Sequence, residues 1–226
     1  MLVIFDVDGT LTRTSALNGR ALARAFEETL QTPMPSRDWA DYPRVSATGL
    51  LEDAAQRALD RPPTEPERAA VRARYVELVA TTLFSMKERL EVPGAVQALD
   101  RLRAAGHAVA LATGDWRESA QIKLERDGFD VDDVPLAAAD DALAREDIIR
   151  AAYQASGGAD VHPHVVYVGD EVWDLSAARS LGLAIVGLSA DGQDARLREA
   201  GVQDILRDFE DFYLFESHLM HALARR

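Results

Sequence analysis

Short, mostly apolar runs recur along the chain and do not alternate between apolar and polar positions. These runs are residues 2–5, 108–113, 164–170 and 183–188. Strands that are buried on both faces of a parallel sheet have this pattern. Segments with helical spacing lie between and after them, at residues 94–106, 116–128, 145–158 and 172–182. Strands that alternate with helices predict an α/β fold with a doubly wound parallel sheet.

One long stretch interrupts this alternation. Residues 14–91 contain no convincing strand and have helical spacing, and Thr64 with Glu67 forms a capping-box pair at the start of one helix. We therefore predict a core domain of residues 1–13 and 92–226 and a helical domain, residues 14–91, inserted after the first strand. The last residues, 208–226, have the pattern of a terminal amphipathic helix.

The composition limits which molecules the protein is expected to bind and in which cellular compartment it is expected. The 226 residues are 47% hydrophobic and 28% charged, with a formal net charge of −13 and no cysteine. Such an acidic chain is expected to bind neither nucleic acid nor an anionic membrane. No apolar run approaches the ~20 residues of a membrane span. The strand signal at Leu2 leaves no room for a secretory signal, so we expect a cytoplasmic protein, either monomer or homodimer.

Polar side chains gather where the predicted strands end. Asp6 and Asp8 follow the first strand, Thr113 and Gly114 the second, and Asp170 the third, with Asp174 soon after. Ligands bind at the carboxyl ends of strands in α/β sheets. Because clustered carboxylates repel one another, the sequence predicts a cation there, and oxygen ligands suit Mg²⁺.

These residue types can together transfer a phosphoryl group. A carboxylate can act as a nucleophile and form an aspartyl-phosphate. A second acid can protonate the leaving oxygen and then deprotonate water. The Thr113 hydroxyl and amides at a helix N-terminus can hold phosphate oxygens.

Three motifs carry a resemblance to a known family. They are DVDGT at residues 6–10, LATGD at 111–115 and VGDEVWD at 168–174. In this order they resemble the haloacid dehalogenase-like (HAD) superfamily, and in particular its phosphoglycolate phosphatase-like members. The helical insert resembles that family's C1-type cap, which covers the active site and selects a small phosphorylated metabolite.

The resemblance implies a role for each motif residue. Asp6 matches the nucleophile and a Mg²⁺ ligand, and Asp8 matches the general acid/base, whose backbone carbonyl also binds the metal. Asp170 and Asp174 match the remaining metal-binding acids. The phosphate-binding loop residues implied in the same way are Gly9, Thr10, Thr113 and Gly114. Asp115 is expected only to cap the following helix.

The sequence departs from the family at one position, because no lysine precedes the third motif where the family usually has one. Lys123 is the only lysine between Thr113 and Asp170. It lies about ten residues beyond Thr113, which at ~1.5 Å per residue places it on the order of 15 Å from the strand end. We therefore expect Arg145 to replace the family's lysine and to clamp phosphate, with Lys123 as the alternative if the helix is distorted.

Several functions share these residues. The sequence favours a Mg²⁺-dependent phosphatase; the alternatives are a phosphomutase acting on a sugar phosphate and a non-catalytic ligand-binding protein. A dehalogenase would need neither Asp8, Asp170 nor Asp174. Substrate choice is expected in residues 41–53, where Arg44, Ser46 and Thr48 precede a helix.

Overall fold

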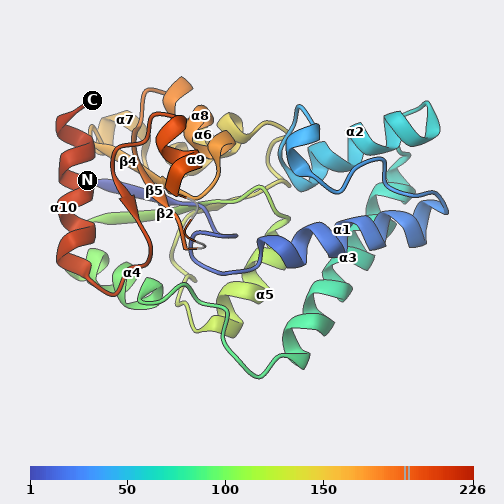
Figure 1. Ribbon diagram of the computed structural model, residues 1–226, viewed down its shortest axis with the longest axis horizontal. Coiled ribbons are helices and arrows are strands. Elements are labelled where there is room, and N and C mark those ends of the chain that lie inside the picture. The colour runs from blue at the N-terminus through green and yellow to red at the C-terminus, as the bar shows by residue number, and fades with distance from the viewer. Residues whose placement is uncertain (191, 193) are drawn as a thin grey trace.

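The protein is built on one parallel β-sheet. The computed structural model describes residues 1–190, 192 and 194–226. Within these residues six strands lie in the order β3-β2-β1-β4-β5-β6 (Figure 1). The strands are β1 (Leu2–Phe5), β2 (Ala108–Ala112), β3 (Leu136–Ala137), β4 (Val165–Gly169), β5 (Ala184–Leu188) and β6 (Ile205–Leu206). Every pairing is parallel, so the predicted fold class is confirmed.

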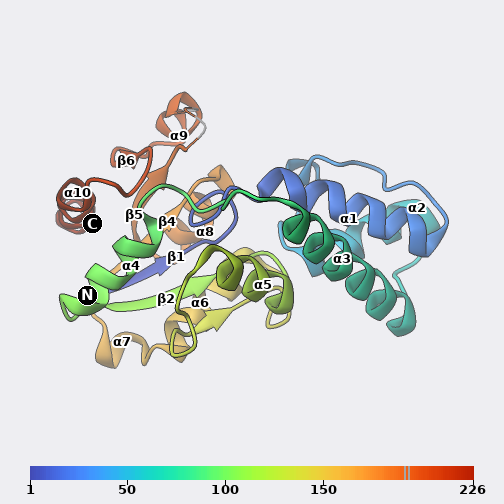
Figure 2. The same cartoon turned by 90° about the horizontal axis from the view of Figure 1, so that it is seen from below.

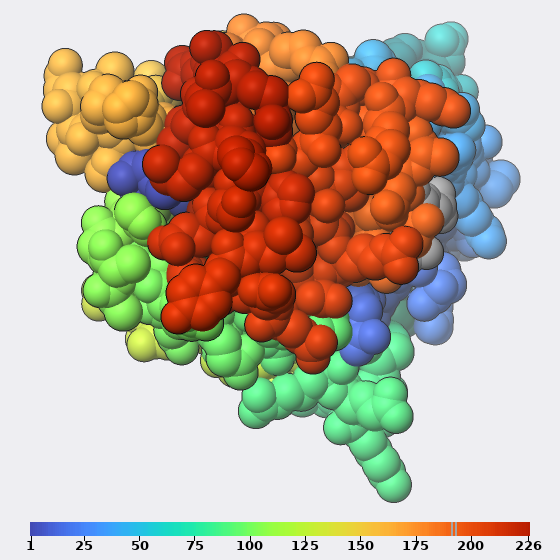
Figure 3. Space-filling view, turned by 60° about the vertical axis from the view of Figure 1, so that its left-hand side comes forward, coloured from blue at the N-terminus to red at the C-terminus, as the bar shows by residue number. Residues whose placement is uncertain are grey.

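Helices cover both faces of the sheet. They are α4 (Ala95–Ala104), α5 (Arg117–Asp127), α6 (Arg145–Ala155), α7 (Gly158–Val161), α8 (Val172–Ser180), α9 (Asp194–Glu199) and α10 (Phe212–Ala224). Val3 and Phe5 pack with side chains of α4 and α10, whereas Leu2 and Ile4 pack with α6 and α8. Successive residues of β1 thus enter opposite cores, which explains why this strand is apolar throughout. The segment from β5 onward covers much of the face in Figure 3.

The sequence did not predict the two shortest strands, β3 and β6. Each has only two residues and lies at an edge of the sheet. A run this short carries no usable hydrophobic period, so its strand conformation follows from pairing with its neighbour.

A layer of helices stands beside the carboxyl edge of the sheet, at the right of Figures 1 and 2. It comprises α1 (Ser15–Leu30), the short 3₁₀ helix η1 (Trp39–Asp41), α2 (Ala47–Leu59) and α3 (Glu65–Ser85). Their apolar faces form a cluster separate from the two sheet cores. The predicted capping box is confirmed, because Glu67 Oε2 accepts a hydrogen bond from Thr64 N at 2.7 Å. We call these helices and their loops the cap.

The start of α2 is fastened to loops at the carboxyl ends of β2 and β3. Ala47 N donates to Gly114 O at 2.6 Å, Ser46 Oγ to Leu143 O at 2.7 Å and Thr48 Oγ1 to Ala139 O at 2.7 Å. These bonds hold the cap over the edge where the predicted site residues lie. In the described part of the chain, no helix has the length and apolar character needed to cross a membrane.

Candidate active site

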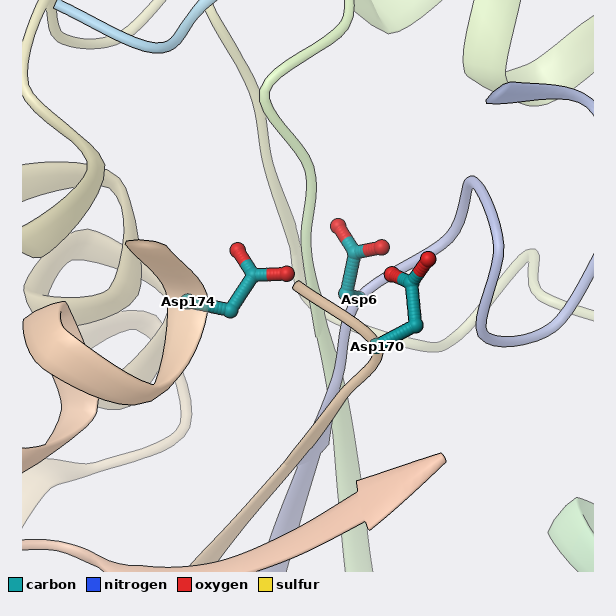
Figure 4. A group of neighbouring side chains, drawn as sticks. All are labelled: Asp6, Asp170 and Asp174. Carbon is teal, nitrogen blue, oxygen red and sulfur yellow. The ribbon is translucent and has the colours of Figure 1, made fainter. Parts of the chain in front are cut away.

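Three carboxylates converge where β1 and β4 end. Asp6 follows β1, Asp170 follows β4, and Asp174 lies in the first turn of α8 (Figure 4). One oxygen of each lies within 4.8 Å of the others. Asp6 and Asp174 are buried, while Asp170 is partly exposed. Strands β1 and β4 are neighbours at the point where the strand order changes direction, which is where α/β sheets bind ligands.

The cluster is electrostatically unfavourable by itself. Burial raises the pKa of Asp6 well above its usual value, and the negative charge of Asp174 raises it further against the opposing effect of Arg145. Burial, followed by the charges of Asp6 and Asp174, likewise raises the pKa of Asp170. Three carboxylates and one guanidinium leave two negative charges, and Asp174 Oδ2 is buried without a hydrogen bond from the described residues. These features fit a divalent cation held by the three acids.

Arg145 is the cation that the structure places on the predicted nucleophile. It begins α6 and is only 7% exposed. Its Nη2 is paired with Asp6 Oδ1, and its Nε lies 2.6 Å from Asp174 Oδ1. The guanidinium therefore orients two acids at once. Its use as a phosphate clamp stays a prediction.

Lys123 also reaches the site, so the distance argument against it was wrong. Its Nζ lies 2.6 Å from Asp8 Oδ1. Only the residues from Arg117 onward are helical, so the helical rise up to Lys123 is about 9 Å, not the ~15 Å that a helix starting at Thr113 would give. Helical side chains also lean toward the N-terminus, and this long side chain spans the remainder.

The carboxylate of Asp8 is directed away from the three-acid cluster. Its Oδ1 accepts hydrogen bonds from Lys123 Nζ and from Thr14 Oγ1, the latter at 2.5 Å. This carboxylate is not one of the three whose oxygens converge. Metal binding by Asp8 therefore stays a prediction that concerns its backbone carbonyl only.

The turn after β1 shapes the site through Gly9 and Thr10. Gly9 has φ +90°, and a Cβ at this position would overlap the carboxylate of Asp170. Thr10 Oγ1 lies 3.3 Å from Asp170 Oδ1, to which it donates. The structure thus links both residues to Asp170 of the acid cluster.

The second motif contributes a glycine to the cavity wall and a buried threonine behind it. Gly114 lines the cavity beside Arg145, whose guanidinium a Cβ at residue 114 would overlap. Thr113 is fully buried, its Oγ1 accepts a hydrogen bond from Asp115 N at 3.0 Å, and it is not among the cavity-lining residues. Phosphate binding by Thr113 and Gly114 stays a prediction.

A cavity of about 330 Å³ opens over these groups. The sheet side contributes the acids Asp6, Asp8, Asp115, Asp170, Glu171 and Asp174 together with Gly114, Arg145 and Trp173, and the cap contributes Asn18, Arg20, Arg37, Asp38 and Trp39. Asn18 is 1% exposed, and its Oδ1 receives no hydrogen bond from any described residue. An unsatisfied buried amide oxygen at a cavity wall is available to a bound molecule.

Three cap residues singled out from the sequence have other partners. Arg44 is bound to Asp53, with Nε at 3.1 Å from Oδ1, while Ser46 and Thr48 bond to the sheet-side loops. None of the three lines the cavity. The cap residues that do so lie on α1, on η1 and in the loops around η1. For Asn18 and Arg20 the sequence signal was a place on the helix that follows the first motif, whereas Arg37 and Trp39 carried none.

Comparison with known proteins agrees with the geometry. The family model described as haloacid dehalogenase-like hydrolase matches residues 1–182. A probable phosphatase, IndB, from Dickeya dadantii is 32% identical over 195 residues, which cover 83% of this chain and 80% of IndB. The chain therefore belongs to the haloacid dehalogenase-like hydrolases.

Two solved structures share the whole fold, cap included. A hydrolase from Pseudomonas syringae is 23% identical, with a TM-score of 0.74 over 95% of this chain and 97% of that one. A β-phosphoglucomutase from Clostridium difficile is 14% identical, with a TM-score of 0.76 over 99% of both chains. Both phosphatases and phosphomutases are thus found among the proteins that this chain is similar to.

Proposed function

We propose that the protein is a Mg²⁺-dependent phosphatase that hydrolyses a small phosphomonoester through an aspartyl-phosphate on Asp6. The observation that carries this proposal is the division of the site into two charged groups. Asp6 lies with Arg145 and two further acids, while Asp8 is held separately by Lys123 and Thr14. Two carboxylates in different surroundings can perform different tasks.

Asp6 is suited to attack phosphorus. Arg145 fixes the orientation of its carboxylate and places a positive charge where the phosphate oxygens would lie. When bound at Asp6, Asp170 and Asp174, Mg²⁺ would supply positive charge to neutralise both the acids and the phosphate. The new bond joins Asp6 oxygen to phosphorus as the bond to the substrate's leaving oxygen breaks.

Asp8 is suited to the proton transfers. It lines the same cavity as Asp6, two residues further along the chain. It would donate a proton to the leaving oxygen and then accept one from the water that hydrolyses the aspartyl-phosphate. Cap closure over the cavity would exclude bulk water during both steps.

A cavity of this size fits a metabolite rather than a macromolecule. CbbY from Rhodobacter sphaeroides, which shares the fold at 22% identity, has been solved with phosphate and, as a mutant, with xylulose bisphosphate. Those ligands support a phosphorylated small substrate here. Arg20 at the cap side of the cavity supplies positive charge for such an anion despite the net negative charge of the chain, whereas Arg37, which also lines the cavity, is paired with Glu27.

Metal dependence is the experiment that tests the proposal. With Mg²⁺ the protein should release p-nitrophenol and equimolar inorganic phosphate from p-nitrophenyl phosphate, and EDTA should abolish the release. Mg²⁺ should also raise the melting temperature, because it stabilises only the folded arrangement of the acids. Activity that survives chelation would contradict the metal role. A folded, Mg²⁺-loaded protein that releases no phosphate from any of a panel of phosphomonoesters would contradict the phosphatase.

Phosphomutase activity predicts a different product. A mutase would move label from a sugar phosphate to another position of a sugar, with little inorganic phosphate released. Arg44, which lies in the stretch where substrate choice is expected, is bound to Asp53 outside the cavity. This pairing removes Arg44 as a partner for a second phosphate, whereas Arg20 lines the cavity, so the ratio of free phosphate to transferred phosphate decides between the two activities.

Asn18 is expected to recognise the leaving group. Replacing it by alanine removes a buried amide that faces the cavity, so kcat/KM for polar phosphomonoesters should fall about tenfold. The value for p-nitrophenyl phosphate, whose ring offers no hydroxyl hydrogen bonds, should change much less. Steady-state kinetics on both substrates gives the ratio. An equal fall of kcat/KM for both substrates would show that Asn18 supports the fold or the phosphate site rather than the leaving group.

A further inference from the structure

Lys123 is buried in a way that the chemistry at phosphorus does not explain. Its side chain is 0% exposed, and its Nζ lies 2.6 Å from Asp8 Oδ1 and 2.5 Å from Asp115 Oδ2. Burying a lysine is costly even when it is paired. Arg145 already provides the cation at Asp6. The interaction of Lys123 with Asp8 therefore requires a separate reason.

The hydrogen bonds that described residues donate to the Asp8 carboxylate are all on one oxygen. Lys123 Nζ and Thr14 Oγ1 both donate to Oδ1, and Thr14 Oγ1 is itself 2.6 Å from Thr12 Oγ1. No hydrogen bond from a described residue reaches Oδ2. An oxygen that accepts two donors has no room for a proton of its own, so a proton carried by Asp8 resides on Oδ2.

Lys123 is in turn fixed from behind. Asp115 Oδ1 accepts a hydrogen bond from Trp116 N at 2.7 Å, so its other oxygen is held toward Lys123. The ring of Trp116 packs against Tyr75 of the cap helix α3 with centroids 5.0 Å apart. The ammonium group therefore has a defined position, set by residues of both the sheet side and the cap.

We propose that Lys123 is a positioning residue that, with Asp115 and Thr14, occupies Asp8 Oδ1 and thereby aims Oδ2 at the leaving oxygen of the substrate. This inference rests on the proposed function. As the bond between phosphorus and the leaving oxygen breaks, that oxygen keeps the electron pair and takes the proton from Asp8 Oδ2. In the second step Oδ2 takes a proton from water, whose oxygen bonds to phosphorus as the bond to Asp6 breaks.

The test compares two leaving groups. The value of kcat/KM reports steps up to the first irreversible one, here formation of the aspartyl-phosphate. The p-nitrophenolate ion leaves readily without a proton, whereas phenolate needs one. In Lys123→Met, kcat/KM for phenyl phosphate should fall roughly a hundredfold, within the range of general acid catalysis. For p-nitrophenyl phosphate it should fall by less than about threefold.

Three further variants keep the result interpretable. Thr14→Val removes the second donor to Asp8 Oδ1 with little change of shape. It should also lose more activity on phenyl phosphate than on p-nitrophenyl phosphate, and it replaces Lys123→Met in the test if that variant does not fold. Lys123→Arg should restore part of the phenyl phosphate activity. Lys87→Met alters the other lysine of the chain, which is exposed, and should match wild type.

Two outcomes would overturn the proposal, and they are distinguishable. An equal loss with both substrates in Lys123→Met and Thr14→Val would show that these residues support the fold or Asp6 rather than the proton transfer. A wild-type protein that hydrolyses neither ester would instead remove the proposed phosphatase, and with it the step that Lys123 is inferred to assist.

Discussion

Replacing Asp6 by asparagine is expected to lower turnover of p-nitrophenyl phosphate by roughly a thousandfold or more, because the amide cannot form the bond to phosphorus. Asparagine keeps the size of the side chain and an oxygen facing Arg145. The loss would therefore come from chemistry rather than from repacking. The comparison uses initial rates at saturating Mg²⁺. Near-normal activity in this variant would exclude Asp6 as the nucleophile.

The same variant should be at least as stable as wild type without metal. The pKa of Asp6 is raised in the folded protein, so the folded state holds more protons than the unfolded state between the unfolded and folded pKa values. Stability from this group is therefore lost as pH rises through that interval, because the carboxylate must then be charged while it is buried. Asp6→Asn removes that charge. Thermal melts in EDTA at several pH values check both points, because the melting temperature of wild type should fall more steeply with rising pH than that of Asp6→Asn, which keeps Asp170 and Asp174.

The positions of the strand ends could be predicted from the sequence because each long strand is an unbroken apolar run. Once an apolar run is read as a buried parallel strand, the next residue must lie at the carboxyl edge, whatever its side chain. That reasoning alone brings Asp6 and Asp170 together, and the structure places their carboxylates in one cluster. The runs that became β3 and β6 were too short to be recognised in this way.

Sequence reasoning did not predict contacts that depend on the direction of a side chain rather than on the position of the residue along the chain. Lys123 was judged too far by counting along the chain, but a helix that begins late and a side chain that leans backward bring it to Asp8. Asp115 was expected only to cap a helix, yet it holds that lysine. Asn18 lacks any motif, and only the unsatisfied amide oxygen in the folded protein distinguishes it.

Replacing Arg145 by methionine is expected to damage both stability and turnover. Methionine fills a similar volume without charge, which leaves Asp6 and Asp174 buried without their cation. Breaking a buried ion pair in this way costs about 3–5 kcal/mol in the free energy of unfolding. Loss of the charge facing the phosphate should lower kcat by about 10²–10³-fold. Urea denaturation and steady-state rates, measured well below the melting temperature, give the two quantities separately.

The variant Arg145→Lys tests whether the charge of Arg145 or the forked shape of its guanidinium group matters. Arg145 uses two different nitrogens for Asp6 and Asp174, and one ammonium group has to serve both acids in Arg145→Lys. Arg145→Lys should recover most of the stability and part of the turnover, because it keeps a positive charge beside the two acids. Arg150 lies on the exposed side of the same helix and, among the described residues, pairs only with Asp147. Arg150→Met should therefore change the free energy of unfolding by less than about 0.5 kcal/mol and leave kcat unchanged. If Arg145→Met were as active as Arg150→Met, the guanidinium would serve only to balance the buried acids, and the phosphate charge would have to be met by the metal and the backbone amides alone.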